Sequence, residues 1–423
     1  MSEYQVLGVR TPRTDALLEA SGQVVYGADI VYPDMLYAAA RYSDYAHARI
    51  LSVDVSEAER SPGVRGVITA KDVPVNRFGY KFQDQPVLAD YKVYCKQDAV
   101  AVVAADTEAQ AQLAAEKIRV EYEPLTPVLD PVEAMKDEVL VQEGSSNVVA
   151  HIKLRKGDVE AGFAAADKIV EEELSTQKVE HVPLEPHVAL SELRPDGQLV
   201  ITTSTSRAFA YITQLLKILR MDMTQLRVLT PAVGGAFGGK NDVSLEPWVA
   251  LLTLKTGRPV KMVFSRKEEF FTTLRHPYRM KYKTGLKQDG TILARKIEII
   301  SDSGPYVCLG RDTLTKASVH AAGPYNIPNI SVDSYLVYTN SALGGAMRGF
   351  GVPQVAFAHE VHTDTIAHEL GMDPVEFRRK NLFCARGEAA TGQLLDSRAM
   401  RATFERALEL QKKSNEGREE LQA

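Results

Sequence analysis

Two glycine-rich segments constrain the fold of this chain more than any other feature of its sequence. The first glycine loop is Gly-Gly-Ala-Phe-Gly-Gly-Lys at 234–240, and the second is Gly-Gly-Ala-Met-Arg-Gly-Phe-Gly at 344–351. Together they hold 8 of the 28 glycines, a residue that permits positive φ and lets another group approach the main chain closely. Each loop lies between a predicted strand (226–230, 332–338) and a predicted helix (244–255, 353–370). The sequence therefore predicts two strand–loop–helix units, with tight turns at a strand crossing as the plain structural alternative.

The first loop also comes close to a phosphate-binding motif. Gly234, Gly239 and Lys240 fit the spacing G-x-x-x-x-G-K-[ST], but the next residue is Asn241. A nucleotidase of this type needs a hydroxyl at that position to bind Mg²⁺, and no strand ending in a matching acid is evident. The sequence therefore disfavours a P-loop nucleotidase.

The hydrophobic pattern divides the chain near residue 145. Before that point, a buried strand at 100–104, a helix at 107–117 and an alternating strand at 118–122 indicate α/β layering. A Pro-, Glu- and Ser-rich stretch over 124–147 reads as a long connection. In the second part, Asp289-Gly290 lies between two alternating runs and predicts a long β-hairpin. We expect one domain over 1–145 and another over 146–423.

Charge and cysteine content exclude several classes of function. With 50 basic and 55 acidic residues the net charge is −5, which disfavours nucleic acid as a partner. The three cysteines, Cys95, Cys308 and Cys384, are far apart and disfavour a disulfide framework or an iron–sulfur cluster on this chain. No stretch approaches the roughly 18 apolar residues of a membrane span. We expect a cytoplasmic protein with no membrane contact.

Four motifs in a fixed order resemble one enzyme family. They are the first glycine loop, Arg275-His276-Pro277, Tyr325-Asn326-Ile327-Pro328-Asn329-Ile330, and the run from Ala346 to Gln354. Their order and spacing resemble the molybdenum-binding subunit of the xanthine dehydrogenase and aldehyde oxidase family, and the opening from Arg13 to Asp29 resembles the start of its first domain. The resemblance implies an α+β fold. An α/β hammerhead-like domain over 1–145 would precede the first part of a molybdopterin-binding domain of mixed sheets and helices over 146–423.

The resemblance also assigns roles to residues of the two loops. It implies a molybdenum held by the dithiolene of a pterin, so that no protein side chain need bind the metal. Gly235, Phe237 and Gly238 would bring main-chain groups close to the cofactor, and Arg348 would lie beside the metal. The ring of Phe350 would form one wall of a slot for a flat substrate, where stacking orients the ring. A core aromatic is the alternative for Phe350.

Three positions depart from the family pattern. Lys316 stands where xanthine-oxidising members carry an arginine that faces a substrate oxygen, and its ammonium could still bind a carbonyl or carboxylate. A solvated surface lysine is the alternative. Ser206 stands where a longer glutamine commonly reaches the metal's apical oxygen, so that contact would be lost or pass through water. Asn241 replaces a glutamate that could shuttle a proton, which disfavours xanthine as substrate.

The resemblance implies a particular reaction and set of partners. Full-length members continue beyond the last motif, so we expect a second molybdopterin-subunit chain to supply most pterin contacts and the glutamate general base, in the split form found in nicotinate dehydrogenase. The expected reaction hydroxylates an N-heteroaromatic, nicotinate or a purine such as xanthine or hypoxanthine, with oxygen from water. Iron–sulfur clusters and FAD on other subunits would take the electrons, and the pterin could carry a cytosine dinucleotide. The alternatives are an aldehyde-oxidising member or a non-catalytic assembly partner of the same fold.

Overall fold

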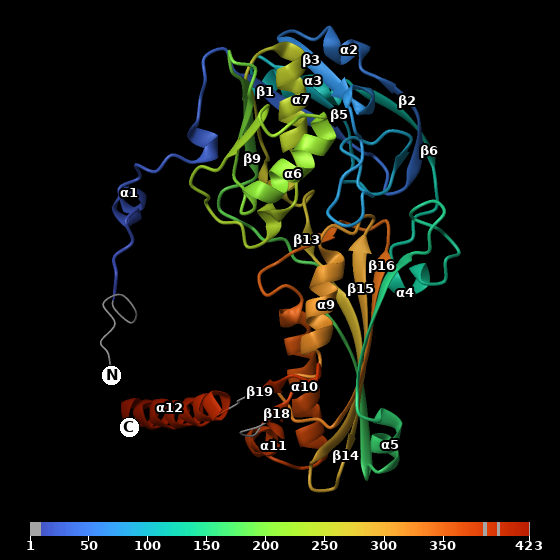
Figure 1. The fold of residues 1–423 in the computed structure, drawn as a ribbon, viewed down its shortest axis with the longest axis vertical. Helices are drawn as coiled ribbons and strands as arrows, with labels where there is room; N and C mark the ends of the chain where they lie inside the picture. Colours follow the sequence, from blue (N-terminus) through green and yellow to red (C-terminus); the bar gives the residue numbers. More distant parts are fainter. Residues whose placement is uncertain (1–9, 384–386, 396–397, 423) are drawn as a thin grey trace.

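The chain folds into two lobes, each built around one β-sheet (Figure 1). The computed structural model describes residues 10–383, 387–395 and 398–422, so Cys384 lies outside the described residues. Cys95 and Cys308 are free thiols. Two projections leave the lobes, an N-terminal arm with α1 (Ala16–Ala20) and the long helix α12 (Arg398–Gln422). Among the described helices, none is both long and apolar enough to cross a membrane.

The first lobe holds a seven-stranded sheet in the order β11-β10-β9-β12-β1-β5-β3. Its strands are β1 (Leu36–Tyr42), β3 (Val64–Thr69), β5 (Ala99–Ala105), β9 (Val188–Leu193), β10 (Leu199–Thr203), β11 (Leu226–Leu229) and β12 (Val260–Val263). Every residue of β5 is buried, because helices cover both faces of the sheet at this strand. Helix α3 (Glu108–Glu116) lies on one face and α7 (Glu246–Thr256) on the other, and α6 (Ala208–Leu219) covers the second face at β11.

Strands from both parts of the sequence meet in this sheet. Strand β1 pairs in parallel with β12, with Leu36 opposite Val260. The sheet therefore spans the boundary expected near residue 145, and the division into 1–145 and 146–423 stays a prediction. A separate three-stranded sheet, β4-β2-β6, covers the outer side of the lobe. Its strands are β2 (Ala48–Asp54), β4 (Lys92–Val93) and β6 (Arg119–Pro124).

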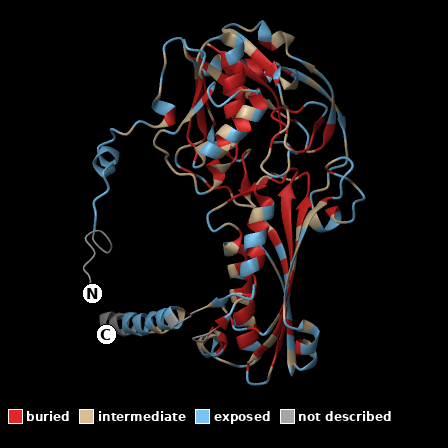
Figure 2. Cartoon of the chain, viewed as in Figure 1, coloured by how far each residue is buried: buried red, intermediate tan, exposed pale blue. Residues whose placement is uncertain are grey.

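The second lobe is a five-stranded sheet in the order β7-β16-β15-β14-β8. Its strands are β7 (Val148–Lys156), β8 (Lys168–Ser175), β14 (Tyr278–Leu286), β15 (Ile292–Gly304) and β16 (Asn329–Tyr338). Strands β14 and β15 form the predicted hairpin around Asp289-Gly290. One face packs against α9 (Gly310–His320), α10 (Val352–Glu369) and α11 (Pro374–Asn381), and the other carries α4 (Pro131–Ala134) and α5 (Val159–Ala164). Figure 2 shows the buried core between the sheet and the long helices.

A small parallel pair, β13 (Leu274–Arg275) and β17 (Gly344–Gly345), lies where the two lobes meet (Figure 1). The second glycine loop begins in β17, and the fully buried ring of His276 packs against its first residue. A Cβ on Gly344 would come within 2.5 Å of that ring, which explains why glycine stands there. Burial lowers the pKa of His276 to about 4, so this side chain is a neutral packing residue.

Candidate functional site

The two glycine loops touch through their main chains. The Arg348 amide donates a hydrogen bond of 2.7 Å to the Phe237 carbonyl. Gly238 has a φ of +108°, and a Cβ at this position would come within 2.6 Å of the Ala346 carbonyl oxygen. Glycine is therefore required here both by its backbone conformation and by the approach of the second loop. The predicted residues Phe237, Gly238 and Arg348, far apart in sequence, lie together.

Both aromatic residues of the loops have left-handed backbones. Phe237 has a φ of +51° and Phe350 a φ of +56°, a region that bulky residues rarely adopt. Gly235 has a φ of +100°, and a Cβ there would come within 3.1 Å of the Phe237 ring. Contacts within the two loops hold these backbone conformations. The conformation of Phe237 turns its ring outward, so that 46% of the residue's surface is exposed.

The tips of the loops offer free groups to a ligand. Arg348 is exposed and Phe350 is partly buried. Within the described residues, no hydrogen bond uses the amide N–H of Phe237 or Gly238. Free amides beside an arginine suit an oxo or phosphate oxygen, so the loops fit the oxygen-rich molybdenum–pterin group that the sequence implies. The described residues contain no cluster of three or more His, Cys, Asp or Glu side chains placed to hold a metal ion.

Lys316 lies on α9, the helix against which the second loop packs. A Cβ on Gly351 would come within 2.5 Å of the Thr313 carbonyl oxygen, one helical turn before Lys316. Lys316 is exposed, and its carbonyl accepts a hydrogen bond of 2.8 Å from His320 Nδ1. The structure therefore brings Lys316 close in the fold to the second loop, while its contact with a substrate stays a prediction.

Ser206 lies against the end of the first loop. Its amide donates to the Lys240 carbonyl at 3.2 Å, and the Thr205 hydroxyl donates to the same oxygen. The side chain of Ser206 is exposed. The neighbouring Asn241 is partly buried, and its carbonyl accepts a hydrogen bond of 2.6 Å from the Tyr80 hydroxyl.

Residues 181–187, which we term the strap, run behind both loops and were not found from the sequence. Glu185 Oε2 accepts hydrogen bonds of 2.8 Å from the Gly234 amide and from Lys240 Nζ. His181 Nε2 donates to the Ala346 carbonyl of the second loop at 2.7 Å. One segment therefore fixes both loops, and only the unusual density of His, Glu and Pro in HVPLEPH could have drawn attention to it.

Lys240 points into the protein. Its side chain is fully buried against Glu185, so the structure excludes the phosphate-binding role that a P-loop would give it. Burial lowers the pKa of Lys240, and the Glu185 carboxylate partly offsets this effect. Lys240 therefore stabilises the first loop through its buried ion pair with Glu185.

The last residue of the strap carries a second ion pair. His187 Nδ1 lies 3.0 Å from Glu269 Oε1, and its Nε2 donates to the Gly239 carbonyl at 3.2 Å. Burial alone would raise the pKa of Glu269, but the hydrogen bond and charge of His187 hold it below its ordinary value. This pair ties the end of the first loop to the rest of the first lobe.

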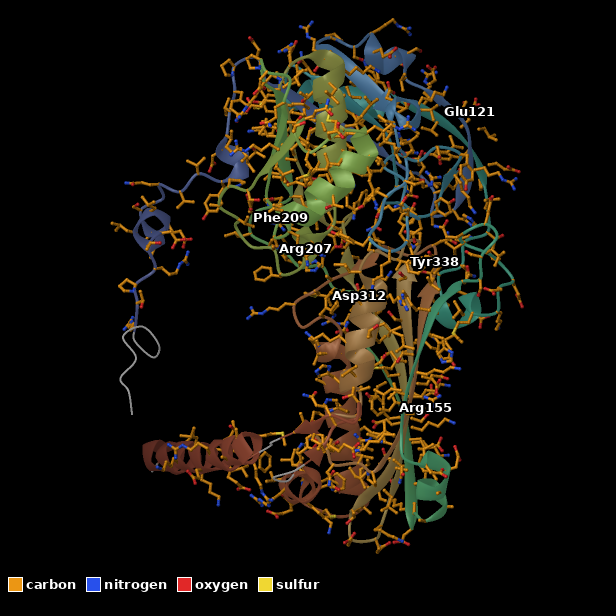
Figure 3. All side chains as sticks on the ribbon, in the orientation of Figure 1. Glu121, Arg155, Arg207, Phe209, Asp312 and Tyr338 are labelled. Carbon is orange, nitrogen blue, oxygen red and sulfur yellow. The ribbon has the colours of Figure 1, made fainter. Side chains whose placement is uncertain are left out.

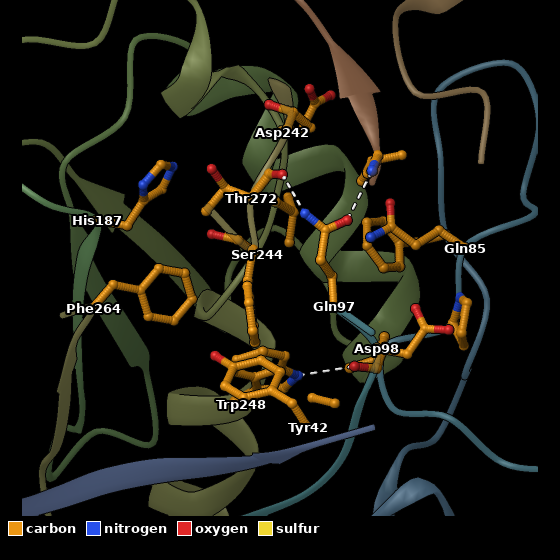
Figure 4. Close-up of a pocket in the computed structure, with 18 of the residues that line it drawn as sticks. Tyr42, Gln85, Gln97, Asp98, His187, Asp242, Ser244, Trp248, Phe264 and Thr272 are labelled. Carbon is orange, nitrogen blue, oxygen red and sulfur yellow. Dashed lines mark hydrogen bonds between the residues drawn. The ribbon is translucent and has the colours of Figure 1, made fainter. Parts of the chain in front are cut away.

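A cavity of about 70 Å³, lined by both polar and aromatic residues, lies behind the first loop (Figure 4). Asp242, Ser244, His187 and Gly239 are among the residues that line it. Neither carboxylate oxygen of Asp242 has a hydrogen-bond partner in the described part of the chain. Burial raises the pKa of Asp242 to about 7, and the positive charges of Arg207 and His187 only partly oppose this rise. The cavity is large enough to hold water.

Two family models match the chain. The molybdopterin cofactor-binding domain matches residues 141–382, and the aldehyde oxidase and xanthine dehydrogenase a/b hammerhead domain matches residues 21–126. These matches confirm the predicted fold class, a hammerhead domain followed by a molybdopterin-binding domain of mixed sheets and helices.

Curated proteins and solved structures resemble almost the whole chain. The nicotinate dehydrogenase large molybdopterin subunit of Eubacterium barkeri is 38% identical over 96% of this chain and 96% of its own length. A probable xanthine dehydrogenase subunit of Bacillus subtilis is 38% identical over 88% of this chain and 50% of its own length. The solved aldehyde oxidoreductase of Desulfovibrio gigas superposes with a TM-score of 0.90 at 33% identity over 93% of this chain. The chain spans about half the length of these last two proteins.

The buried Lys240–Glu185 pair should be essential for loop stability. In Lys240→Met the stem is kept while the Glu185 carboxylate loses its ammonium partner, so we expect a loss of about 3–5 kcal/mol in the free energy of unfolding. Lys283→Met, which breaks the exposed pair with Glu171, is the control and should cost less than about 1 kcal/mol. Denaturant unfolding measures both losses, and equal losses would show that the buried pair does not support the loop.

The buried carboxyl of Asp242 should make stability fall as pH rises. Its pKa in the folded protein lies above the unfolded value, so wild type loses stability relative to Asp242→Asn from about pH 4 until the folded group ionises near pH 7. The full difference is up to about 4 kcal/mol. We expect the Tm advantage of Asp242→Asn to grow between pH 5 and 8. The Tm of the exposed control Asp196→Asn should follow that of wild type at every pH. A Tm advantage of Asp242→Asn that does not change with pH would mean that Asp242 ionises freely in the folded protein.

Proposed function

The chain belongs to the aldehyde oxidase and xanthine dehydrogenase family of molybdenum-dependent dehydrogenases, and we propose that it is the large molybdopterin subunit of an enzyme that hydroxylates an N-heteroaromatic compound. The observation that carries this proposal is the contact between the two glycine loops, with free amides at Phe237 and Gly238 beside the exposed Arg348. In a purely structural domain, amides left free beside an exposed arginine would have no evident use.

The loops would hold the cofactor through main-chain groups. The amides of Phe237 and Gly238 donate hydrogen bonds to its oxygens, Gly235 leaves room for the ring of Phe237, and Arg348 adds a positive charge. The side chain of Ser206 is exposed at the end of the first loop, and its short hydroxyl would reach the cofactor only through a water molecule. When bound, molybdenum–molybdopterin supplies the two-electron oxidation and the oxygen derived from water. The cytosine dinucleotide form belongs to this proposal as well.

Phe350 and Lys316 would orient the substrate. The partly buried ring of Phe350 offers one face to a flat molecule, and the exposed ammonium of Lys316 binds an oxygen of that molecule. Asn241 has a side-chain amide at a position where proton transfer to a purine would need an acid. A pyridine carboxylate such as nicotinate therefore fits Phe350, Lys316 and Asn241 better than a purine does. The name of the Eubacterium barkeri relative agrees with this choice.

We further propose that the site is shared with a second molybdopterin-subunit chain. The relative matched over 96% of its length is itself named a large subunit. Apolar side chains are exposed around the candidate site: Leu184 is 90% exposed, and Phe209 (Figure 3) is 85% exposed. Side chains exposed to this extent are available to pack against a partner subunit. The partner would supply a glutamate as general base, and iron–sulfur and FAD subunits would carry the electrons away.

Metal analysis and isotope labelling of the purified native complex test the function together. We expect stoichiometric molybdenum and hydroxylation of nicotinate that incorporates ¹⁸O from labelled water. A complex without molybdenum would favour the non-catalytic assembly partner. Oxidation of aldehydes without hydroxylation of any N-heteroaromatic would favour the second candidate, an aldehyde-oxidising enzyme. This candidate is considered because the solved structure from Desulfovibrio gigas is an aldehyde oxidoreductase.

Substitution of Lys316 tests the substrate oxygen. Lys316→Met keeps the stem and removes the charge, so kcat/KM for nicotinate should fall by about tenfold or more. The loss should be much smaller for unsubstituted pyridine, which lacks the oxygen. Lys296→Met, an exposed lysine on β15, serves as the matched control and should change neither value. Equal losses for both substrates would show that Lys316 does not contact the substrate oxygen.

A further inference from the structure

A tight turn of the first lobe, residues 79–81, is fixed to three different elements. The Gly79 amide donates to Gln214 Oε1 on α6 at 3.0 Å, and the Tyr80 hydroxyl donates to the Asn241 carbonyl at the end of the first glycine loop at 2.6 Å. Lys81 Nζ donates to Asp312 on α9 at 2.6 Å. We term residues 79–81 the docking turn, because it joins α6, the first loop and the helix that carries Lys316.

A groove of about 240 Å³ runs between the docking turn and α6. It is lined by Gly79, Tyr80, Arg207, Ala210, Thr213, Gln214 and Lys217. The lining residues include two cationic side chains and no acidic one, so the groove favours an anion. Its volume lies below the range of about 300–1,000 Å³ found for drug-sized ligands, and it suits a single small ring or acid.

Arg207 is held ready to bind an anion. Its guanidinium lies over the ring of Tyr80, with Cζ 4.9 Å from the ring centre, and the Tyr80 hydroxyl is fixed by its bond to Asn241. In the described part of the chain, no carboxylate forms an ion pair with Arg207, although Asp242 lies near enough to feel its charge. A guanidinium fixed on an aromatic platform can bind a carboxylate through two hydrogen bonds without losing much side-chain entropy.

The groove lies beside the candidate site. Arg207 directly follows Ser206, which contacts the end of the first loop, and the docking turn bonds to Asp312, one helical turn before Lys316. Figure 3 shows Arg207 at the start of α6 and Asp312 at the start of α9, where the two lobes meet. A molecule whose acid group lay in this groove would therefore lie next to both loops.

We propose that this groove is a binding site for the carboxylate of the substrate, with Arg207 as the residue that binds it and Tyr80 as the platform that holds Arg207. The inference rests on the proposed function, because it narrows the substrate class to aromatic acids. The proposed function already gives Lys316 an oxygen of the substrate, and Arg207 would bind the same carboxylate through two hydrogen bonds.

Equilibrium binding to the native complex tests this site, with pyridine-3-carboxylate and its neutral amide as probes. In Arg207→Gln we expect carboxylate affinity to fall by roughly ten- to a hundredfold, because a charge-assisted pair is lost. Affinity for the amide should not change. Arg207→Lys keeps the charge without the two-pronged geometry and should recover part of the loss. Arg227→Gln removes an exposed arginine of β11 and should match wild type.

Each outcome separates this inference from the proposed function. Unchanged carboxylate affinity in Arg207→Gln, equal losses for acid and amide, or a wild type that binds both probes equally well would overturn the carboxylate site, even if the complex hydroxylates N-heteroaromatics. A wild type that binds the acid through Arg207 but hydroxylates no N-heteroaromatic would support the site and contradict the proposed function.

Discussion

The candidate site depends on one main-chain contact, the close approach of Gly238 to Ala346 and the hydrogen bond from the Arg348 amide to the Phe237 carbonyl. The first loop extends from the seven-stranded lobe, whereas the second follows the five-stranded sheet and the short strand pair at the junction. Any side chain at Gly238 would separate the loops. The geometry of the site is therefore set by a few main-chain atoms, while other hydrogen bonds, such as that from Lys81 to Asp312, also join the lobes.

Buried charges support this contact from behind. The strap holds the first loop through Glu185 and His187 and the second through His181, and it leads directly into β9 of the seven-stranded sheet. A buried ion pair contributes little net stability over an apolar packing of the same shape, but removing one partner is costly. We infer that such pairs are used here to fix one loop conformation, including the left-handed backbone of Phe237, which packing alone would not select.

Local patterns in the sequence predicted the elements better than their assembly. The buried strand β5, the hairpin of β14 and β15 and the two glycine loops were predicted, since each depends on neighbouring residues. The β1–β12 pairing, the strap and the docking turn were not, because their partners lie far apart in sequence and no spacing rule connects them. Lys240 shows the limit most clearly. The sequence disfavoured a P-loop because of Asn241, but it did not predict that Lys240 points inward, since that depends on Glu185, which lies far from it in sequence.

The parallel pairing of β1 with β12 has a consequence for synthesis of the chain. Strand β1 can pair with β5 soon after residue 105 leaves the ribosome, but its other edge has no partner until Val260 follows. At about 5–20 residues per second, that edge stays bare for roughly 10–30 s. An uncovered strand edge can pair with other chains. The edge of β1 is therefore open to such pairing during this interval, and the sheet becomes complete only when the site-bearing half has begun to fold.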